Sequence, residues 1–329
     1  MRLTIAAAET LVAEVLMGKG VTEGNALSVA RALVSAEAAG QGGHGLRRVP
    51  AYAAQAVAGK VDGKARPVAT RPRPGVLLID AQNGYAYPAL DLAVELLVPI
   101  AREQGIAIAA ISRSHHAGVM ALTVERFADQ GLAAMMFANA PASMAPWGGR
   151  KPLYGTNPIA FATPVADGEP IVIDLALSKV ARGKIMAAAQ KDEPVPDDWA
   201  FDAEGNPTSN PHAALAGTMA PLGGAKGAAL AMMVEILSAG LIGANYAYES
   251  SSLFDDKGEP VALGQTIIAI DPVATGGSGV LRRLKELADE IDAQEGARIP
   301  GRRGQSLRRQ AIETGIEIED EVIQAVKSA

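Results

Sequence analysis

The alternation of short apolar runs with amphipathic stretches from about residue 75 onward restricts the fold more than any other feature of the chain. Apolar residues recur at helical spacing between the runs, and turn formers bound the runs themselves. The predicted strands are 76–79, 106–111, 132–137, 158–161, 171–174 and 266–270, and the predicted helices are 88–103, 119–130, 178–190 and 226–241. This order is typical of an α/β or α+β fold.

Both ends of the chain have a helical pattern instead. Two helices are predicted before residue 40, with Thr4 and Thr22 as caps and glycines at their ends. A charged helical tail begins near Leu281 and is interrupted at Pro300-Gly301. We expect the two ends to pack together, because the chain has no internal repeat and no low-complexity linker that would separate autonomous domains.

Composition excludes several classes of function. The 329 residues include no cysteine, which rules out disulfides, thiolate metal sites and thiol nucleophiles. A formal net charge of −6 argues against a nucleic-acid binder, whose surface is basic. Glu9 and Glu14 interrupt any signal-peptide apolar region, so we expect a cytoplasmic protein. The apolar stretch 228–244 has Glu235 at its centre, which favours a buried helix over a membrane span.

Two glycine-rich segments are candidates for phosphate binding. GQGGHG at 40–45 formally satisfies GxGxxG, but it follows a predicted helix, whereas a dinucleotide fingerprint follows a strand and opens a helix. We therefore reject a Rossmann site there. GGAKG at 223–227 does precede a helix, so its N–H groups and Lys226 could hold a phosphate. The alternative there is a tight turn with a solvated lysine.

The chain has only four histidines, and three of them lie in loops rich in glycine or serine. His44 is followed by Arg47 and Arg48, which suit a carboxylate ligand beside a proton donor. A plain surface role is the alternative for such a histidine. His115 and His116 follow a strand, and adjacent positions rarely share one metal ion, so we predict no metal site.

Three further segments carry polar groups with both a structural and a functional interpretation. The loop YGTNP at 154–158 consists of turn formers, and Asp174 lies between a strand and a helix, where α/β proteins often bind ligands. Arg298, Arg302 and Arg303 form a basic cluster that is either an anion clamp or a solvated turn. The residues alone therefore indicate an α/β enzyme that handles a small anionic molecule.

Five motifs together resemble the malate/L-lactate dehydrogenase family of the non-Rossmann type. They are HGLRRVPAY (44–52), SRSHHAG (112–118), MAPWGGRKPLYGTNPIAFATP (144–164), IVIDLALSKVARGK (171–184) and GGAKGAALAMMVEILSAGL (223–241). The resemblance implies a homodimer in which a largely antiparallel, mixed cofactor-binding sheet lies beside a helical domain made from both chain ends. The expected segments are 1–75 with the catalytic loop, 76–275 for cofactor and substrate, and 276–329 packing on the first.

The same resemblance implies NADH or NADPH as the hydride donor and a small carboxylate as substrate. His44 is the expected proton donor, and Arg48, Thr156, Arg182 and Gly183 are the expected substrate-binding residues. The residues expected to contact the cofactor are His116, Ala117, Gly118, Val119, Met120, Asp174, Leu175, Ala176, Ala225, Lys226, Gly301, Arg302 and Arg303. Arg302 and Arg303 would also suit the extra phosphate of NADPH.

Two positions depart from the family's imine reductases. These enzymes resemble the chain around GTNPIAF and MMVE, but they form a charge relay from a serine and an aspartate where this chain has Gly43 and Lys184. A water or Ser114 is our hypothesis for the group that orients His44 instead. We rank Δ1-pyrroline-2-carboxylate/Δ1-piperideine-2-carboxylate reduction first, (R)-sulfolactate dehydrogenation second and malate or lactate third. The alternative of another class is a ligand-binding relative without catalysis.

Overall fold

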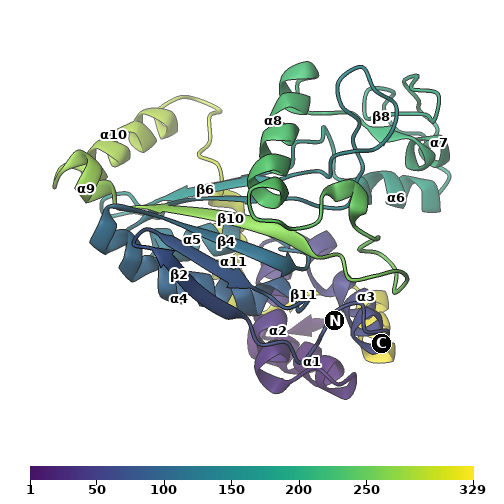
Figure 1. Ribbon diagram of the computed structural model, residues 1–329, viewed down its shortest axis with the longest axis horizontal. Helices are drawn as coiled ribbons and strands as arrows, with labels where there is room; N and C mark the ends of the chain where they lie inside the picture. The colour runs from purple at the N-terminus through teal and green to yellow at the C-terminus, as the bar shows by residue number, and fades with distance from the viewer.

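A seven-stranded sheet organises the computed structural model, which describes all residues from 1 to 329 (Figure 1). Along the sheet the strands follow the order β2 (Val68–Arg73), β3 (Val76–Asp80), β4 (Ile106–Ser114), β10 (Leu263–Ile270), β5 (Ala133–Ala138), β6 (Ile159–Thr163) and β7 (Ile171–Leu175). Only β3 and β4 run parallel, and every other neighbouring pair is antiparallel. The predicted mixed, largely antiparallel sheet is therefore confirmed.

Helices α4 (Ala86–Gln104) and α5 (Ala121–Ala128) cover one face of this sheet (Figure 1). Alanines dominate the contact: Ala109 of β4 and Ala269 of β10 are fully buried, as are Ala89 and Ala93 of α4. Small side chains let helix and strand approach closely, and interiors are packed without voids. The ends of the strands in this layer are consequently held in fixed positions.

The two ends of the chain meet in a helical layer. β1 (Arg2–Leu3) pairs with β11 (Ile316–Glu317), and the terminal ammonium group donates to Asp320 Oδ1 at 2.8 Å. Figure 1 shows the N- and C-termini close together beside this layer. Its helices are α1 (Ile5–Gly18), α2 (Glu23–Ala38), α3 (Val49–Val57), α11 (Arg302–Thr314) and α12 (Asp320–Ser328). The predicted helical region formed from both ends is confirmed, but of the C-terminal segment 276–329 only α11 and α12 pack on the N-terminal helices.

A smaller core lies on the other side of the sheet. It includes Leu177, Ile185 and Val234 and is built largely by segments between β7 and β10. The elements there are α6 (Arg182–Gln190), β8 (Ala200–Phe201), α7 (Pro211–Ala216), β9 (Thr218–Met219) and α8 (Ala225–Glu235). Two further helices, α9 (Pro272–Gly276) and α10 (Val280–Asp292), extend away from the sheet after β10 (Figure 1).

Several local predictions are corrected by the structure. The helix expected from residue 178 begins only at Arg182, because Leu177 and Lys179 exchange backbone hydrogen bonds with Leu222 and Ala220. The helix expected to reach 241 ends at Glu235 and continues as a π-helical turn, Ile236–Gly240. Thr4 caps α1 as predicted, but the Thr22 side chain makes no capping bond.

The apolar stretch around Glu235 is part of this smaller core. No helix combines the length and the apolar character needed to cross a membrane. Glu235 is 4% exposed, and both of its carboxylate oxygens accept hydrogen bonds, from Asn157 Nδ2 at 2.7 Å and from the Ala247 amide at 2.6 Å. The buried helix favoured by the sequence is therefore the one observed.

Candidate active site

The loop that carries His44 is held tightly against α2. It forms two 3-10 turns, Gly42–His44 and Leu46–Arg48, after the helix ends. Glu37 Oε2 accepts a hydrogen bond from the Leu46 amide at 2.8 Å. A Cβ at Gly45 would lie 2.2 Å from that same oxygen, so only glycine permits the approach. GQGGHG is therefore a helix-to-loop junction, in agreement with our rejection of a dinucleotide fingerprint.

Arg48 follows His44 by one turn and keeps most of its donors free. Its Nε donates to the Gly43 carbonyl at 2.9 Å, which fixes the side chain, while neither terminal nitrogen has a partner. The Phe254 ring lies over the guanidinium, with 4.7 Å between Cζ and the ring centroid. A guanidinium anchored through Nε can still bind a carboxylate through two parallel N–H groups.

The adjacent histidines after β4 have different hydrogen-bond partners. His116 stacks on His44 with 5.2 Å between ring centroids, and its Nδ1 lies 2.7 Å from the Tyr52 hydroxyl. The His115 ring packs edge-on against Tyr52 with 5.2 Å between ring centroids, and its Nε2 lies 2.7 Å from Gln55 Oε1. His44, Arg48 and His116 are thus brought together, whereas His115 has a structural partner. Tyr52 ends the HGLRRVPAY motif but was given no role from the sequence, and Phe254 lies outside all five motifs.

Burial and positive charge keep these histidines neutral. Burial, followed by repulsion from Arg48, lowers the pKa of His44 to about 4. The same two causes hold the pKa of His116 well below its ordinary value, and the pKa of His115 falls to about 3 through burial, Lys60 and Arg48. His44 Nδ1 is buried without a hydrogen-bond partner. The sequence hypothesis that Ser114 orients His44 is wrong, since its hydroxyl is buried without any partner.

The segments expected to contact a cofactor converge around β7. Asp174 Oδ2 accepts from the Ala121 amide at 2.8 Å, which joins β7 to the segment 116–120. The Leu222 amide donates to Leu177, bringing the turn before Ala225 and Lys226 to the same end of the strand. On the other side, a Cβ at Gly301 would lie 2.7 Å from the Val172 carbonyl, so the start of α11 also contacts β7.

Charged groups in this region differ in whether they are already paired. Arg302 donates to Glu169 Oε2 at 2.8 Å, while Arg303 and Lys226 are exposed and have no ion-pair partner. Asp174 caps the start of α5, and desolvation raises its pKa to about 6. Asp174 therefore has a structural role in addition to any contact with a ligand.

The remaining predicted substrate residues lie at the entrance to α6. The Thr156 carbonyl accepts from the Leu177 amide at 2.8 Å, so the 154–158 loop contacts the segment that leads to Arg182. Arg182 begins α6, is partly buried and has no hydrogen bond or ion pair. Its burial lowers the pKa of the guanidinium, and Gly183 beside it is exposed with open space around its Cα. No direct contact joins Thr156 or Arg182 to His44. No group of three histidine, aspartate or glutamate side chains is arranged to hold a metal ion.

Known proteins match this chain along its whole length. The family model described as malate/L-lactate dehydrogenase matches residues 3–327. A (2R)-3-sulfolactate dehydrogenase (NADP(+)) of Chromohalobacter salexigens is 47% identical over 99% of this chain and 97% of its own. A Δ1-pyrroline-2-carboxylate/Δ1-piperideine-2-carboxylate reductase of Pseudomonas putida is 39% identical over 99% of this chain and 96% of its own. The structure of Δ1-piperideine-2-carboxylate reductase from Pseudomonas syringae superposes with a TM-score of 0.93 at 38% identity, covering 100% and 99% of the two chains.

The fold, the site and these similarities together make the chain an NAD(P)-dependent oxidoreductase. It belongs to the malate/L-lactate dehydrogenase family, as the sequence motifs indicated.

Proposed function

We propose that the protein reduces a small 2-oxo acid that carries a second anionic group. The leading candidate reaction is the reduction of 3-sulfopyruvate to (R)-sulfolactate. The observation that carries this proposal is that two of the predicted substrate-binding residues are arginines with unpaired donors. Arg48 keeps two terminal nitrogens free, and the partly buried Arg182 has no partner. Desolvating a cation without a counterion is costly, so a partly buried arginine without a partner favours an anionic ligand.

The positive charges near the site argue against the cyclic imine, which we ranked first from the sequence. A protonated imine carries a positive charge at the reacting nitrogen, which an aspartate can stabilise. This chain has Lys184 there, with its ammonium 6.0 Å from the Trp199 ring centroid. The 47% identity to a (2R)-3-sulfolactate dehydrogenase supports the same choice. Δ1-pyrroline-2-carboxylate reduction stays the second candidate, on the close superposition with the Pseudomonas syringae reductase.

The residues around β7 fit a dinucleotide phosphate. Lys226 and the start of α8 follow a turn that is hydrogen-bonded to Leu177 just after β7, and helix N-termini bind anions. Arg303 lies at the start of α11 without a partner, where it can pair with the extra phosphate of NADPH. We therefore propose NADPH, the form named for the Chromohalobacter salexigens enzyme. When bound, the cofactor supplies the hydride.

The chain's own residues bind the acid and move the proton. Arg48 binds the carboxylate through its free terminal nitrogens, which orients C2 of the substrate. His44 donates a proton to the substrate oxygen as negative charge develops there, and His116 supports its ring by stacking. The carboxylate offsets the charge of Arg48, which is one of the two causes of the lowered His44 pKa. Substrate binding thus favours the protonated acid that the reaction needs.

A second copy of the chain is the partner we propose for α8. Ala231 and Val234 bury one side of this helix in the small core, while Leu230, Met233 and Ile236 are exposed on the other. A helix that is apolar on all sides is normally covered on all sides. We expect Leu230→Glu with Met233→Glu to convert a dimer to a monomer in light scattering after gel filtration. Leu287→Glu, on exposed α10, is the control that should leave the mass unchanged.

Steady-state reduction of four acids tests the proposed function. With NADPH in excess, 3-sulfopyruvate, oxaloacetate, pyruvate and Δ1-pyrroline-2-carboxylate are compared, and we expect the highest kcat/KM for 3-sulfopyruvate. Pyruvate and 3-sulfopyruvate differ only in the sulfonate, so Arg182→Met should lose affinity for 3-sulfopyruvate while the rate with pyruvate changes little. Arg48→Met should weaken the binding of both 3-sulfopyruvate and pyruvate. A higher kcat/KM for Δ1-pyrroline-2-carboxylate would contradict 3-sulfopyruvate as the leading candidate and favour imine reduction instead.

Exchange of NADPH for NADH tests the cofactor proposal. Arg303→Ala should raise the KM for NADPH about tenfold or more and leave the KM for NADH unchanged, because only NADPH has the extra phosphate. Arg298→Ala removes an equally exposed arginine of the same basic cluster and should change neither. Equal losses with both cofactors would contradict the role of Arg303.

A further inference from the structure

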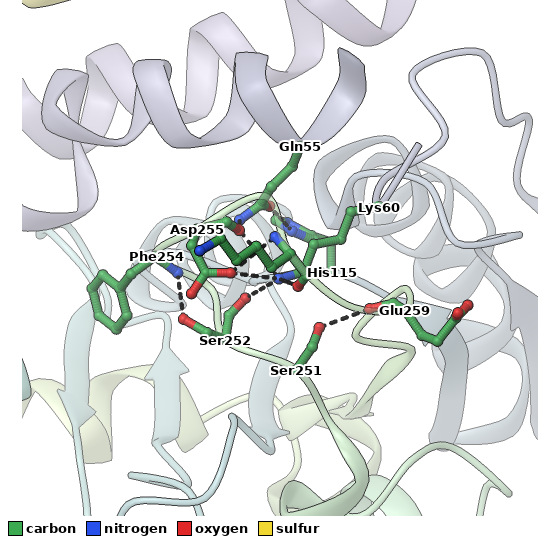
Figure 2. A network of polar contacts seen from close by, with 9 residues as sticks. Gln55, Lys60, His115, Ser251, Ser252, Phe254, Asp255 and Glu259 are labelled. Atoms are coloured by element: carbon green, nitrogen blue, oxygen red, sulfur yellow. Dashed lines mark hydrogen bonds and ion pairs between the residues drawn. The ribbon is translucent and has the colours of Figure 1, made fainter. Parts of the chain in front are cut away.

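Lys60 is a buried lysine outside the predicted site. It is 2% exposed and follows α3, and its ammonium donates to three backbone carbonyls of the segment 251–259, here the 251–259 loop. The acceptors are Ser252 O at 2.5 Å, Lys257 O at 2.7 Å and Asp255 O at 3.1 Å (Figure 2). An ammonium group has three donors, and all three are used on one loop.

Gln55 forms a second link between the same loop and the site. Its Nε2 donates to the Asp255 carbonyl at 2.9 Å, and its Oε1 lies 2.7 Å from His115 Nε2 (Figure 2). Because the amide nitrogen is committed to Asp255, the amide oxygen accepts and His115 carries its proton on Nε2. His115 directly precedes His116, so one chain of contacts connects the loop with the histidine that stacks on His44.

The loop carries one aromatic side chain to the substrate arginine. The Phe254 ring lies 4.7 Å from Arg48 Cζ and is 42% exposed. Its own amide donates to Ser252 Oγ at 3.1 Å, and Ser251 Oγ donates to the Glu259 carbonyl at 2.7 Å, which closes the loop on itself (Figure 2). An aromatic face over a guanidinium attracts the cation and removes water from one side of it.

We propose that Lys60 and Gln55 are positioning residues that clamp the 251–259 loop, and that Phe254 on this loop holds Arg48 in place for the substrate carboxylate. The proposal deepens the proposed function, because it assumes that Arg48 binds the substrate. The clamp also gives this buried lysine a role. Without the loop the ammonium would be a buried charge with no acceptor, so the loop and the lysine hold each other in place.

Kinetics and hydrogen exchange on three variants test the proposal. Phe254→Ala should raise the KM for the acid about tenfold, with kcat within about threefold, because the ring acts on binding of the carboxylate rather than on proton transfer. Phe254→Tyr keeps the aromatic face and should restore the wild-type KM. Lys60→Met should raise the KM as Phe254→Ala does, because the loop no longer holds the ring.

Hydrogen exchange separates the clamp from the ring. In Lys60→Met the amides of the 251–259 loop should exchange at least about tenfold faster, with the rest of the chain unchanged, whereas Phe254→Ala should leave the loop protected. Lys64→Met removes an exposed lysine four positions away and should change neither the KM nor the exchange. If Lys60→Met does not fold, Phe254→Ala decides the proposal. Its ring is exposed, so we expect this variant to fold.

Two results overturn the proposal. One is unchanged loop exchange in folded Lys60→Met, and the other is an unchanged KM in Phe254→Ala. If the wild type reduces none of the four acids, the proposed function fails, but the exchange experiment still decides whether the clamp exists. A rise in KM that occurs equally in Lys64→Met would show a general charge effect and would also overturn the clamp.

Discussion

Two buried polar clusters in this molecule differ in how their central ionisable group is hydrogen-bonded. Around Glu235, both carboxylate oxygens accept hydrogen bonds, from Asn157, Asn139 and the Ala247 amide. Around His44, the Nδ1 atom is buried without a partner, and Arg48 keeps its terminal nitrogens free. Burying polar groups is costly unless they are paired, so the unpaired donors and acceptors around His44 and Arg48 favour a ligand that pairs with them.

The difference separates a structural cluster from a reactive one. Glu235 connects α8 to the 139 and 157 loops, and both of its carboxylate oxygens already accept hydrogen bonds from the protein. His44, His116 and Arg48 lie at the edge of the helical layer, with donor and acceptor positions that a substrate can complete. We expect substitutions in the first cluster to change stability and substitutions in the second to change turnover.

His44→Ala should produce the largest effect, a loss of about 10²–10⁴-fold in turnover, which is the usual contribution of a positioned acid or base. The unfolding free energy should change little, because the buried Nδ1 of His44 has no hydrogen bond to lose. Steady-state kinetics with urea unfolding measures both. His212→Ala, an exposed histidine paired with Asp192, is the control and should keep full activity. Wild-type turnover in His44→Ala would contradict the assignment of the His44 cluster as the reactive one.

Glu235→Leu should have the next largest effect, this time on stability. The change leaves one N–H group of Asn139, one of Asn157 and the Ala247 amide without an acceptor in the core, which costs about 3 kcal/mol or more of unfolding free energy. Urea unfolding measures the loss, and Glu290→Leu on the exposed side of α10 is the control. A change below about 0.5 kcal/mol would mean that the satisfied cluster contributes little to folding.

The stability of the protein should also depend on pH through the buried histidines. Their pKa values lie below the ordinary value of 6.5, so the unfolded chain binds their protons first as pH falls. Stability is therefore full above about pH 7 and is lost as pH falls through 6.5 toward 4. Asp174 acts in the opposite direction, because its pKa is raised to about 6. Asp174→Asn should steepen the fall below pH 6 in urea unfolding curves, and an unchanged slope would contradict this assignment.

Gly43→Ser should have the smallest effect. An added Cβ at Gly43 meets no atom within 4 Å, so the folded state accepts the serine and stability should stay within about 0.5 kcal/mol. Turnover of 3-sulfopyruvate should stay within about threefold, because the second member of the relay is still absent. A gain in cyclic imine reduction is expected only when Lys184→Asp is added. A large gain from Gly43→Ser alone would show that serine is sufficient to orient His44.

Much of the fold could be predicted from local patterns, and the networks within the site could not. The strands and the helical ends follow from apolar periodicity, which is a local property. The start of α6 was placed too early because Leu177 and Lys179 pair with residues more than 40 positions away. Lys60 and Phe254 were missed for a similar reason: their partners, the 251–259 loop and Arg48, lie about 200 positions away along the chain, and no local motif records such contacts.

The dependence of kcat/KM on pH tests most directly whether His44 is the proton donor. Reduction of the best of the four acids is measured from pH 5 to 9 in wild type and in His44→Ala. The free-enzyme pKa of His44 is about 4, so kcat/KM should fall about tenfold per pH unit across this range in wild type. The slope should be absent in His44→Ala. A flat wild-type profile, or the same slope in both proteins, would contradict the assignment.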